Sequence, residues 1–116
     1  MRMMLKAVMD TAAGNTVIAD GSIGQVIGRL VDQLHPEAAY FAPEDGQRCC
    51  FMVFDMADAA DLPSISEPLF QAANARVTIS PCMDLEDLQK GLARLQEAAG
   101  AAVGDGAASR TSAGIG

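Results

Sequence analysis

Tryptophan is absent from this sequence, and aromatic residues make up only 4% of it. No run of residues approaches the ~18 consecutive apolar side chains that a membrane-spanning helix needs. The first ten residues carry Lys6 and Asp10, whereas the core of a secretory signal would be apolar throughout. We therefore expect neither a membrane span nor a secretory signal, and we expect the protein to be cytoplasmic.

Cysteine and histidine are also scarce. The sequence has three cysteines, Cys49, Cys50 and Cys82, and a single histidine, His35. An odd number of cysteines without a secretory signal favours free thiols over disulfides. One histidine and no C-x-x-C pair supply too few ligands for a zinc site, and glycine-rich phosphate-binding fingerprints are absent. We therefore expect no metal and no cofactor.

Basic residues are outnumbered by acidic ones, 8 to 15, which gives a formal net charge of −7. An acidic chain repels phosphate backbones and anionic lipid surfaces, so neither nucleic acid nor a membrane is expected as a partner. Hydrophobic residues make up 50% of the chain and include seven methionines. At this length, a single domain can bury an aliphatic core without disulfides.

Hydrophobic periodicity predicts four strands and three helices. Strands are expected at residues 2–9, 38–42, 47–56 and 76–81, and helices at residues 22–34, 57–75 and from 84 onward. Residues 10–20 contain Gly14 and Asn15 and indicate a loop. Pro68 falls inside the second helical segment and predicts a kink or a break there.

Local signals place the helix ends. Ser22 and Gln25 have the spacing of a capping box, and Asp84 and Asp87 have the same spacing at the start of the last helix. His35 precedes a proline and is expected to end the first helix. Asp61 is expected to cap the second helix, with Pro63 in its first turn.

The order of these elements predicts an α+β fold, a ferredoxin-like βαββαβ sandwich with an additional C-terminal helix. Right-handed crossovers would give a four-stranded antiparallel sheet in the order fourth, first, third, second, with both main helices on one face. We assign residues 1–97 to this single domain. Residues 98–116 are rich in alanine, glycine and serine and are interpreted as a low-complexity tail.

The third predicted strand is apolar on both of its faces. Cys50, Met52, Phe54 and Met56 alternate with Cys49, Phe51 and Val53. With both main helices on one face of the sheet, the second face would expose a contiguous apolar patch, which monomers rarely do. A second copy of the same sheet is the simplest cover, because two-fold pairing buries both patches at once. We therefore expect a homodimer.

Four segments carry a family resemblance: Phe51-Met-Val-Phe-Asp-Met56, Asp61-Leu62, Glu67-Pro-Leu-Phe70 and Val77-Thr-Ile-Ser-Pro81. In these segments the sequence resembles the dimeric α+β barrel superfamily, and within it the muconolactone isomerase-like proteins. The resemblance covers about a third of the chain and consists of packing and turn residues. It implies a pocket between helices and sheet in each subunit, which takes small, mostly apolar or oxygenated organic molecules.

Three polar side chains on the predicted strands are candidate ligand-binding residues: Lys6, Tyr40 and Arg48. Lys6 is the only charge in the middle of the first strand, where it either holds an anion or a carboxylate partner or packs its stem and extends its ammonium group into water. Pro43-Glu44-Asp45-Gly46 predicts a turn that joins the second and third strands in a hairpin, and Tyr40 and Arg48 flank this hairpin roughly opposite each other. They either grip a carboxylate or form a cross-strand packing pair.

Two further candidates, Glu67 and Asn74, lie two helical turns apart and so could share one face of a helix. Glu67 is either an acid of the pocket or a first-turn charge favoured by the helix dipole. Asn74 either contacts a ligand or ends the helix. His35 is the natural acid–base residue near neutral pH, or else it serves the end of its own helix.

Two functions from different classes remain open. The first is a small metal-independent enzyme or binding protein for a small organic acid or lactone. The second is a non-catalytic dimeric module that serves as a scaffold or binds a partner protein. A cavity lined by Lys6 with Glu67, Tyr40 or Arg48 would favour the first function, and a filled interior would favour the second.

Overall fold

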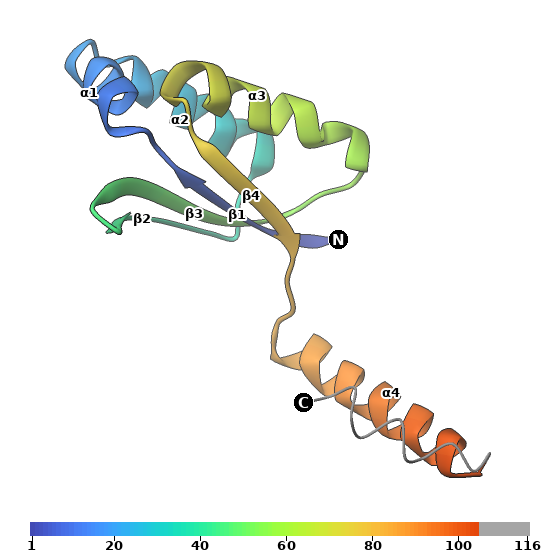
Figure 1. Ribbon diagram of the computed structural model, residues 1–116. Coiled ribbons are helices and arrows are strands. Elements are labelled where there is room, and N and C mark those ends of the chain that lie inside the picture. The colour runs from blue at the N-terminus through green and yellow to red at the C-terminus, as the bar shows by residue number, and fades with distance from the viewer. Residues whose placement is uncertain (105–116) are drawn as a thin grey trace. The chain divides into compact units, whose positions relative to one another are not determined.

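The structure, a computed structural model, describes residues 1–104 (Figure 1). Contacts within the chain separate it into two units, Met1–Cys82 and Met83–Gly116, and each is described by itself. None of the helices in the described part of the chain is both long enough and apolar enough to cross a membrane.

The first unit is built on a four-stranded antiparallel sheet. Its strands are β1 (Arg2–Val8), β2 (Ala38–Glu44), β3 (Gln47–Asp55) and β4 (Arg76–Pro81), in the spatial order β2-β3-β1-β4. In β1, Leu5 pairs with Met52 of β3 on one side and with Ile79 of β4 on the other. The predicted strand order and the central position of the first and third strands are therefore confirmed.

A two-residue turn joins β2 to β3. Asp45 and Gly46 both have left-handed backbone angles, with φ of 51° and 77°. Hairpin turns that match the twist of the strands need positive φ at both central residues, and an Asp-Gly pair tolerates this at low cost. This turn fixes the register in which Pro43 pairs with Arg48 and Tyr40 pairs with Phe51.

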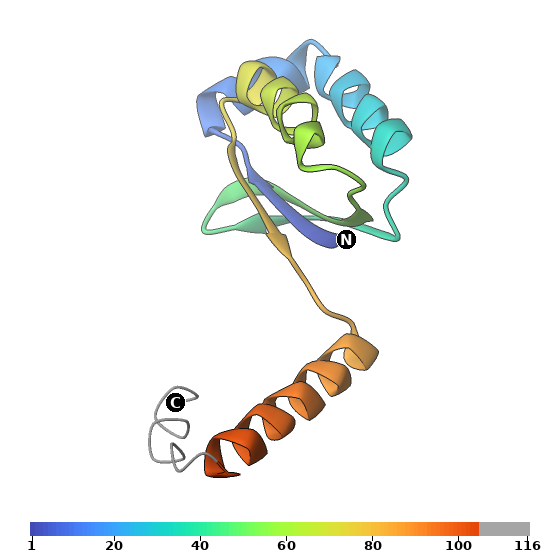
Figure 2. The same ribbon diagram turned by 90° about the vertical axis from the view of Figure 1, so that its right-hand side faces the viewer.

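Three helices, α1 (Thr11–Ala19), α2 (Ser22–Leu34) and α3 (Leu62–Ala73), lie on one side of the sheet (Figures 1 and 2). A short 3₁₀ turn, η1 (Ala59–Asp61), precedes α3. The placement of both main helices, α2 and α3, on one face confirms the prediction. The additional helix α1 means that the element order is not a plain βαββαβ.

The loop predicted for residues 10–20 is wrong, because most of this segment forms α1. The carboxylate of Asp10 accepts a hydrogen bond from the amide of Ala13 at 3.0 Å and caps the helix. Gly14 is buried against the side chain of Arg48, where a Cβ atom would come within 2.8 Å of Nη1. The close contact with Arg48 of β3 therefore explains why glycine occupies this helical position, although its low helix propensity favours a loop.

The start of α2 also differs from the prediction. The cap position is Gly21, which has φ of 78°, and the Ser22–Gln25 capping box does not form. Instead, the amide of Ser22 donates a hydrogen bond to the carboxylate of Asp20 at 2.8 Å, and hydrogen bonding by Ser22 lowers the pKa of Asp20. The helix ends at His35 as predicted.

Of the kink or break predicted at Pro68, the break is wrong, since α3 runs through this residue without interruption. Pro68 has no N–H to donate to the carbonyl of Ser64, which is unfavourable in a helix interior. Ile65 and Leu69 flank Pro68 and are only 1% and 3% exposed. Their burial offsets the lost hydrogen bond. Asp61 occupies the cap position of α3, as predicted, but its side chain forms no cap hydrogen bond. The carboxylate of Asp58 instead accepts a hydrogen bond from the amide of Ala60 and caps η1.

The hydrophobic core lies between the three helices and the sheet. Its largest fully buried side chains are Leu5, Met52, Phe54 and Ile65. Because side chains alternate along a strand, Phe51 of β3 points to the opposite face from Phe54. Phe51 is accordingly only partly buried. The sheet therefore has one packed face and one face that no helix of the first unit covers.

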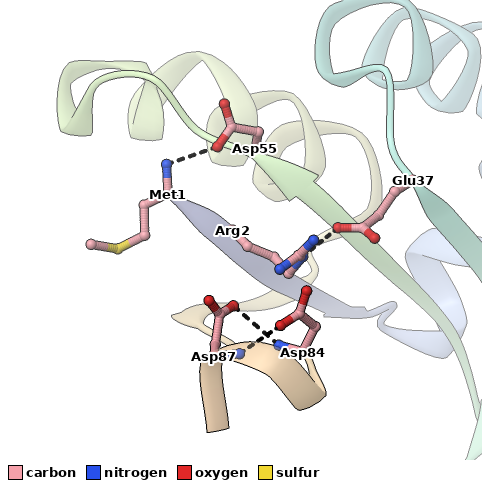
Figure 3. A network of polar contacts seen from close by, with 6 residues as sticks. All are labelled: Met1, Arg2, Glu37, Asp55, Asp84 and Asp87. Atoms are coloured by element: carbon pink, nitrogen blue, oxygen red, sulfur yellow. Dashed lines mark hydrogen bonds and ion pairs between the residues drawn. The ribbon is translucent and has the colours of Figure 1, made fainter. Parts of the chain in front are cut away.

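Polar contacts join residues at the start of β1 to a residue at the end of β3 and to a residue just before β2 (Figure 3). The N-terminal amine of Met1 lies 2.8 Å from Oδ1 of Asp55, and Nε of Arg2 lies 2.5 Å from Oε1 of Glu37. Exposed ion pairs of this kind contribute at most about 1 kcal/mol each to the free energy of unfolding. The core, rather than these contacts, carries the stability of the unit.

The second unit contains α4 (Leu85–Gly104). The amide of Asp87 donates to the carboxylate of Asp84 at 2.8 Å, and the amide of Asp84 donates to the carboxylate of Asp87 at 3.3 Å (Figure 3). This reciprocal pair confirms the predicted cap. The helix continues past residue 98, where the tail was predicted to begin, and residues 105–116 of that tail lie outside the described residues.

Candidate ligand-binding cavity

A cavity of about 330 Å³ lies between the helices and the sheet near the β2–β3 hairpin. Ile18 of α1, Ile23 and Ile27 of α2, Phe41 of β2 and Leu69 of α3 contribute to its apolar wall. Ile23 and Ile27 are four residues apart, so they lie on the same face of α2 and both line the cavity. Its volume is within the range of small-molecule binding sites.

Arg48 is the only charged side chain that lines this cavity in the described part of the chain. It lies near the start of β3, and its Nη2 donates a hydrogen bond to Oδ1 of Asn15 on α1 at 3.0 Å. Its own backbone carbonyl accepts from the amide of Met9 at 2.8 Å. The bond to Asn15 uses one of five guanidinium N–H donors, so the group can also bind a carboxylate.

Tyr40 does not accompany Arg48 at the cavity. In the β2–β3 register Tyr40 pairs with Phe51, on the sheet face that points away from the three helices. Its side chain is 70% exposed. The two residues expected to face each other across the hairpin therefore lie on opposite faces of the sheet, and they form no cross-strand pair.

Lys6 also lies on the face that points away from the three helices. Its ammonium group forms an ion pair with the carboxylate of Glu44 on β2, and this hydrogen bond raises the pKa of Lys6. Cys49 of the intervening strand is 5% exposed. Burial and the charge of Glu44 raise the pKa of its thiol. The carboxylate partner considered for Lys6 is thus a residue of the same chain.

Glu67 and Asn74 are exposed and do not line the cavity. The carboxylate of Glu67 accepts a hydrogen bond from the side chain of Gln71 at 3.4 Å. Asn74 ends α3 with a left-handed backbone, φ of 46°. His35 has the same role at the end of α2, with φ of 45°. Asn74 and His35 therefore match the structural alternative considered for them, a helix end, whereas Glu67 lies beyond the first turn of α3 and is not a first-turn charge.

Neither cysteine that lines the cavity, Cys49 or Cys50, has a lowered thiol pKa. Burial raises the pKa of Cys50 to about 11, and the pKa of Cys49 is raised as well. Because the thiolate is the nucleophilic form, neither cysteine is activated for covalent chemistry. Within residues 1–104, no group of three or more His, Cys, Asp or Glu side chains is arranged to hold a metal ion.

The sequence interpretation missed Asn15, Ile18 and Phe41. Asn15 and Ile18 fall in the segment interpreted as a loop, so their proximity to β3 was not expected. Phe41 was placed on the correct strand but not assigned to a cavity. The sequence signal that was available is that Ile18 and Phe41 are large apolar side chains. In the structure they remain 49% and 58% exposed.

The cavity thus combines an apolar wall with one cationic group at its rim. It contains no sequence motif that would identify a substrate. The sequence matches no protein-family model, and none of the curated proteins is a match for it.

Proposed function

We propose that this protein binds a small, mostly apolar organic acid in the cavity, with the carboxylate of the ligand on Arg48. The observation that carries the proposal is a single arginine on an otherwise apolar wall. A cavity of roughly 150 Å³ holds one benzene molecule. A volume of about 330 Å³ is therefore suited to a ligand of roughly twice that size.

The geometry favours binding over catalysis. Among the described residues that line the cavity there is no histidine and no carboxylate, so the wall offers no acid–base pair. A lactone would fit the apolar wall but would leave the charge of Arg48 without a partner. An organic acid uses both features, and it is therefore the preferred ligand class.

We further propose that the first unit is a ferredoxin-like domain of the dimeric α+β barrel kind, with α1 added between β1 and α2. The strand order β2-β3-β1-β4 and the common side of the helices support this assignment. In this arrangement the cavity lies between helices and sheet, where the superfamily resemblance implies a pocket.

The sheet face that no helix of the first unit covers supports a homodimer. On this face lie Met4 of β1 and Tyr40 of the edge strand β2, which are 42% and 70% exposed, and the partly buried Phe51 and Val53 of β3. We define these four residues as the sheet patch. A two-fold pair of sheets would bury the patch of both copies at once. The ion pair of Lys6 and Glu44 on the same face limits where the partner can pack.

The ligand proposal predicts that Arg48→Gln weakens binding of a carboxylate probe. We choose 4-phenylbutyrate, which has an apolar body and one carboxylate, and expect calorimetric titration to detect its binding to the full chain. A hydrogen bond to a charged group contributes about 1.5–3 kcal/mol. The dissociation constant of the variant should therefore rise by roughly 10- to 100-fold.

Two controls separate this effect from general damage. Arg29→Gln makes the same change on α2 at an exposed residue that does not line the cavity, and it should leave the affinity within about twofold. The neutral amide, 4-phenylbutyramide, should bind the wild type and the Arg48→Gln variant equally well. Equal affinity of the two proteins for the acid would refute the role of Arg48.

A further inference from the structure

Helix α4 carries four leucines along one side: Leu85, Leu88, Leu92 and Leu95. They are 70%, 40%, 50% and 39% exposed. We call them the leucine seam. Their spacing of three, four and three residues is that of the a and d positions of a coiled-coil heptad. A helix that packs on a sheet usually shows a wider apolar stripe. The narrow seam therefore favours a second helix as its partner.

The charged residues of α4 all lie away from this seam. With Leu85 at position a, Glu86, Asp87, Lys90, Arg94 and Glu97 fall at positions b, c and f, on the outer side of a paired helix. The e and g positions beside the seam hold the uncharged residues Gln89, Gly91, Gln96 and Ala98. Two identical helices would therefore meet without placing like charges beside each other.

We propose that α4 pairs with α4 of a second copy of this chain through the leucine seam. Gly91 and Ala98 border the seam and are small, which allows the two backbones to approach closely. The pairing is self-complementary, as a two-fold interface requires. The inference goes beyond the proposed ligand site and does not depend on it.

The seam is short, with two leucines in each of two heptads, so the helix pair alone should be weak. Any other contact between the same two copies raises the effective concentration of the helices and strengthens the assembly. The helix pair should therefore be measured in the full chain, as its effect on the dissociation constant of the dimer.

The test compares Leu92→Lys with Ala93→Lys in the full chain. The two substitutions add the same side chain at adjacent positions, one on the seam and one on the outer side of α4. Leucine and lysine have similar helix propensities, so circular dichroism should show an unchanged helix content. Sedimentation across the micromolar range should show a dissociation constant at least tenfold higher for Leu92→Lys and within about twofold of the wild type for Ala93→Lys.

Other outcomes overturn the proposal. An unchanged dissociation constant for Leu92→Lys would mean that the leucine seam is not an interface between copies, and an equal effect of Ala93→Lys would mean that the charge alone weakens association. A wild type that stays monomeric would refute both this pairing and the pairing through the sheet patch. If Leu92→Lys weakens the dimer and Phe51→Glu does not, the helix pair stands and the sheet pairing fails.

Discussion

Replacing Phe54 with alanine should lower the free energy of unfolding by about 3–5 kcal/mol, which is the usual cost of truncating a buried phenylalanine. Phe54 is 1% exposed and lies on the helix-covered face of β3. Domains of this size have a total stability of about 5–15 kcal/mol, so the variant should be partly unfolded under mild conditions. Urea denaturation followed by circular dichroism measures the difference.

Phe70→Ala provides the matched control for this prediction. Phe70 lies on α3 and is 43% exposed, so the same truncation removes less buried area. Its loss should stay below about 1.5 kcal/mol, since a partly exposed side chain contributes only part of its transfer free energy. Equal losses for the two variants would contradict the placement of Phe54 in the core.

The second large effect is expected for Phe51→Glu, which should separate the proposed homodimer while leaving each subunit folded. Phe51 belongs to the sheet patch and points away from the core. Association through this patch would bury the new carboxylate without a partner, at a cost of several kcal/mol. Sedimentation at micromolar concentration should show a mass near 12.0 kDa, half that of the wild-type dimer.

Phe70→Glu makes the same chemical change on α3, on the side of the molecule opposite the sheet patch. It should leave the sedimenting mass unchanged. The proposed sheet pairing would be refuted by a wild type that sediments at 12.0 kDa, or by a Phe51→Glu variant that remains dimeric while folded.

The sheet was predictable because its signals are local. The Asp45-Gly46 turn determines which residues pair in the hairpin. Once the turn sets the register, the side chains of the hairpin strands are assigned to one face of the sheet or the other. When the helices of the first unit pack on one face, none of them covers the other face. The strand order then follows from right-handed crossovers between neighbouring elements.

The helices were harder to predict where tertiary contacts outweigh local preference. Gly14 and Asn15 favour a loop by composition, yet Arg48 packs on Gly14 and binds Asn15, which favours a helix there. Pro68 favours a break, yet Ile65 and Leu69 are buried on either side of it. Neither contact can be inferred from the neighbouring residues in the sequence.

The candidate site was predictable by residue type but not by position. Arg48 was one of five candidate ligand-binding residues and lines the cavity, whereas its hydrogen-bond partner Asn15 comes from a segment interpreted as a loop. Tyr40 was grouped with Arg48 because both flank the hairpin. A shift of one residue in strand register exchanges the two faces, so closeness in sequence does not place two side chains on one face.

The central claim is that a small organic acid occupies the cavity, and the isoleucine methyl signals in a two-dimensional NMR spectrum test it most directly. Ile18, Ile23 and Ile27 line the cavity, whereas Ile65 and Ile79 do not. On titration with 4-phenylbutyrate, the methyl signals of the first three should shift and saturate together, while those of Ile65 and Ile79 should move little. The account would be contradicted if no isoleucine signal shifted, or if Ile65 and Ile79 responded as strongly as the cavity residues.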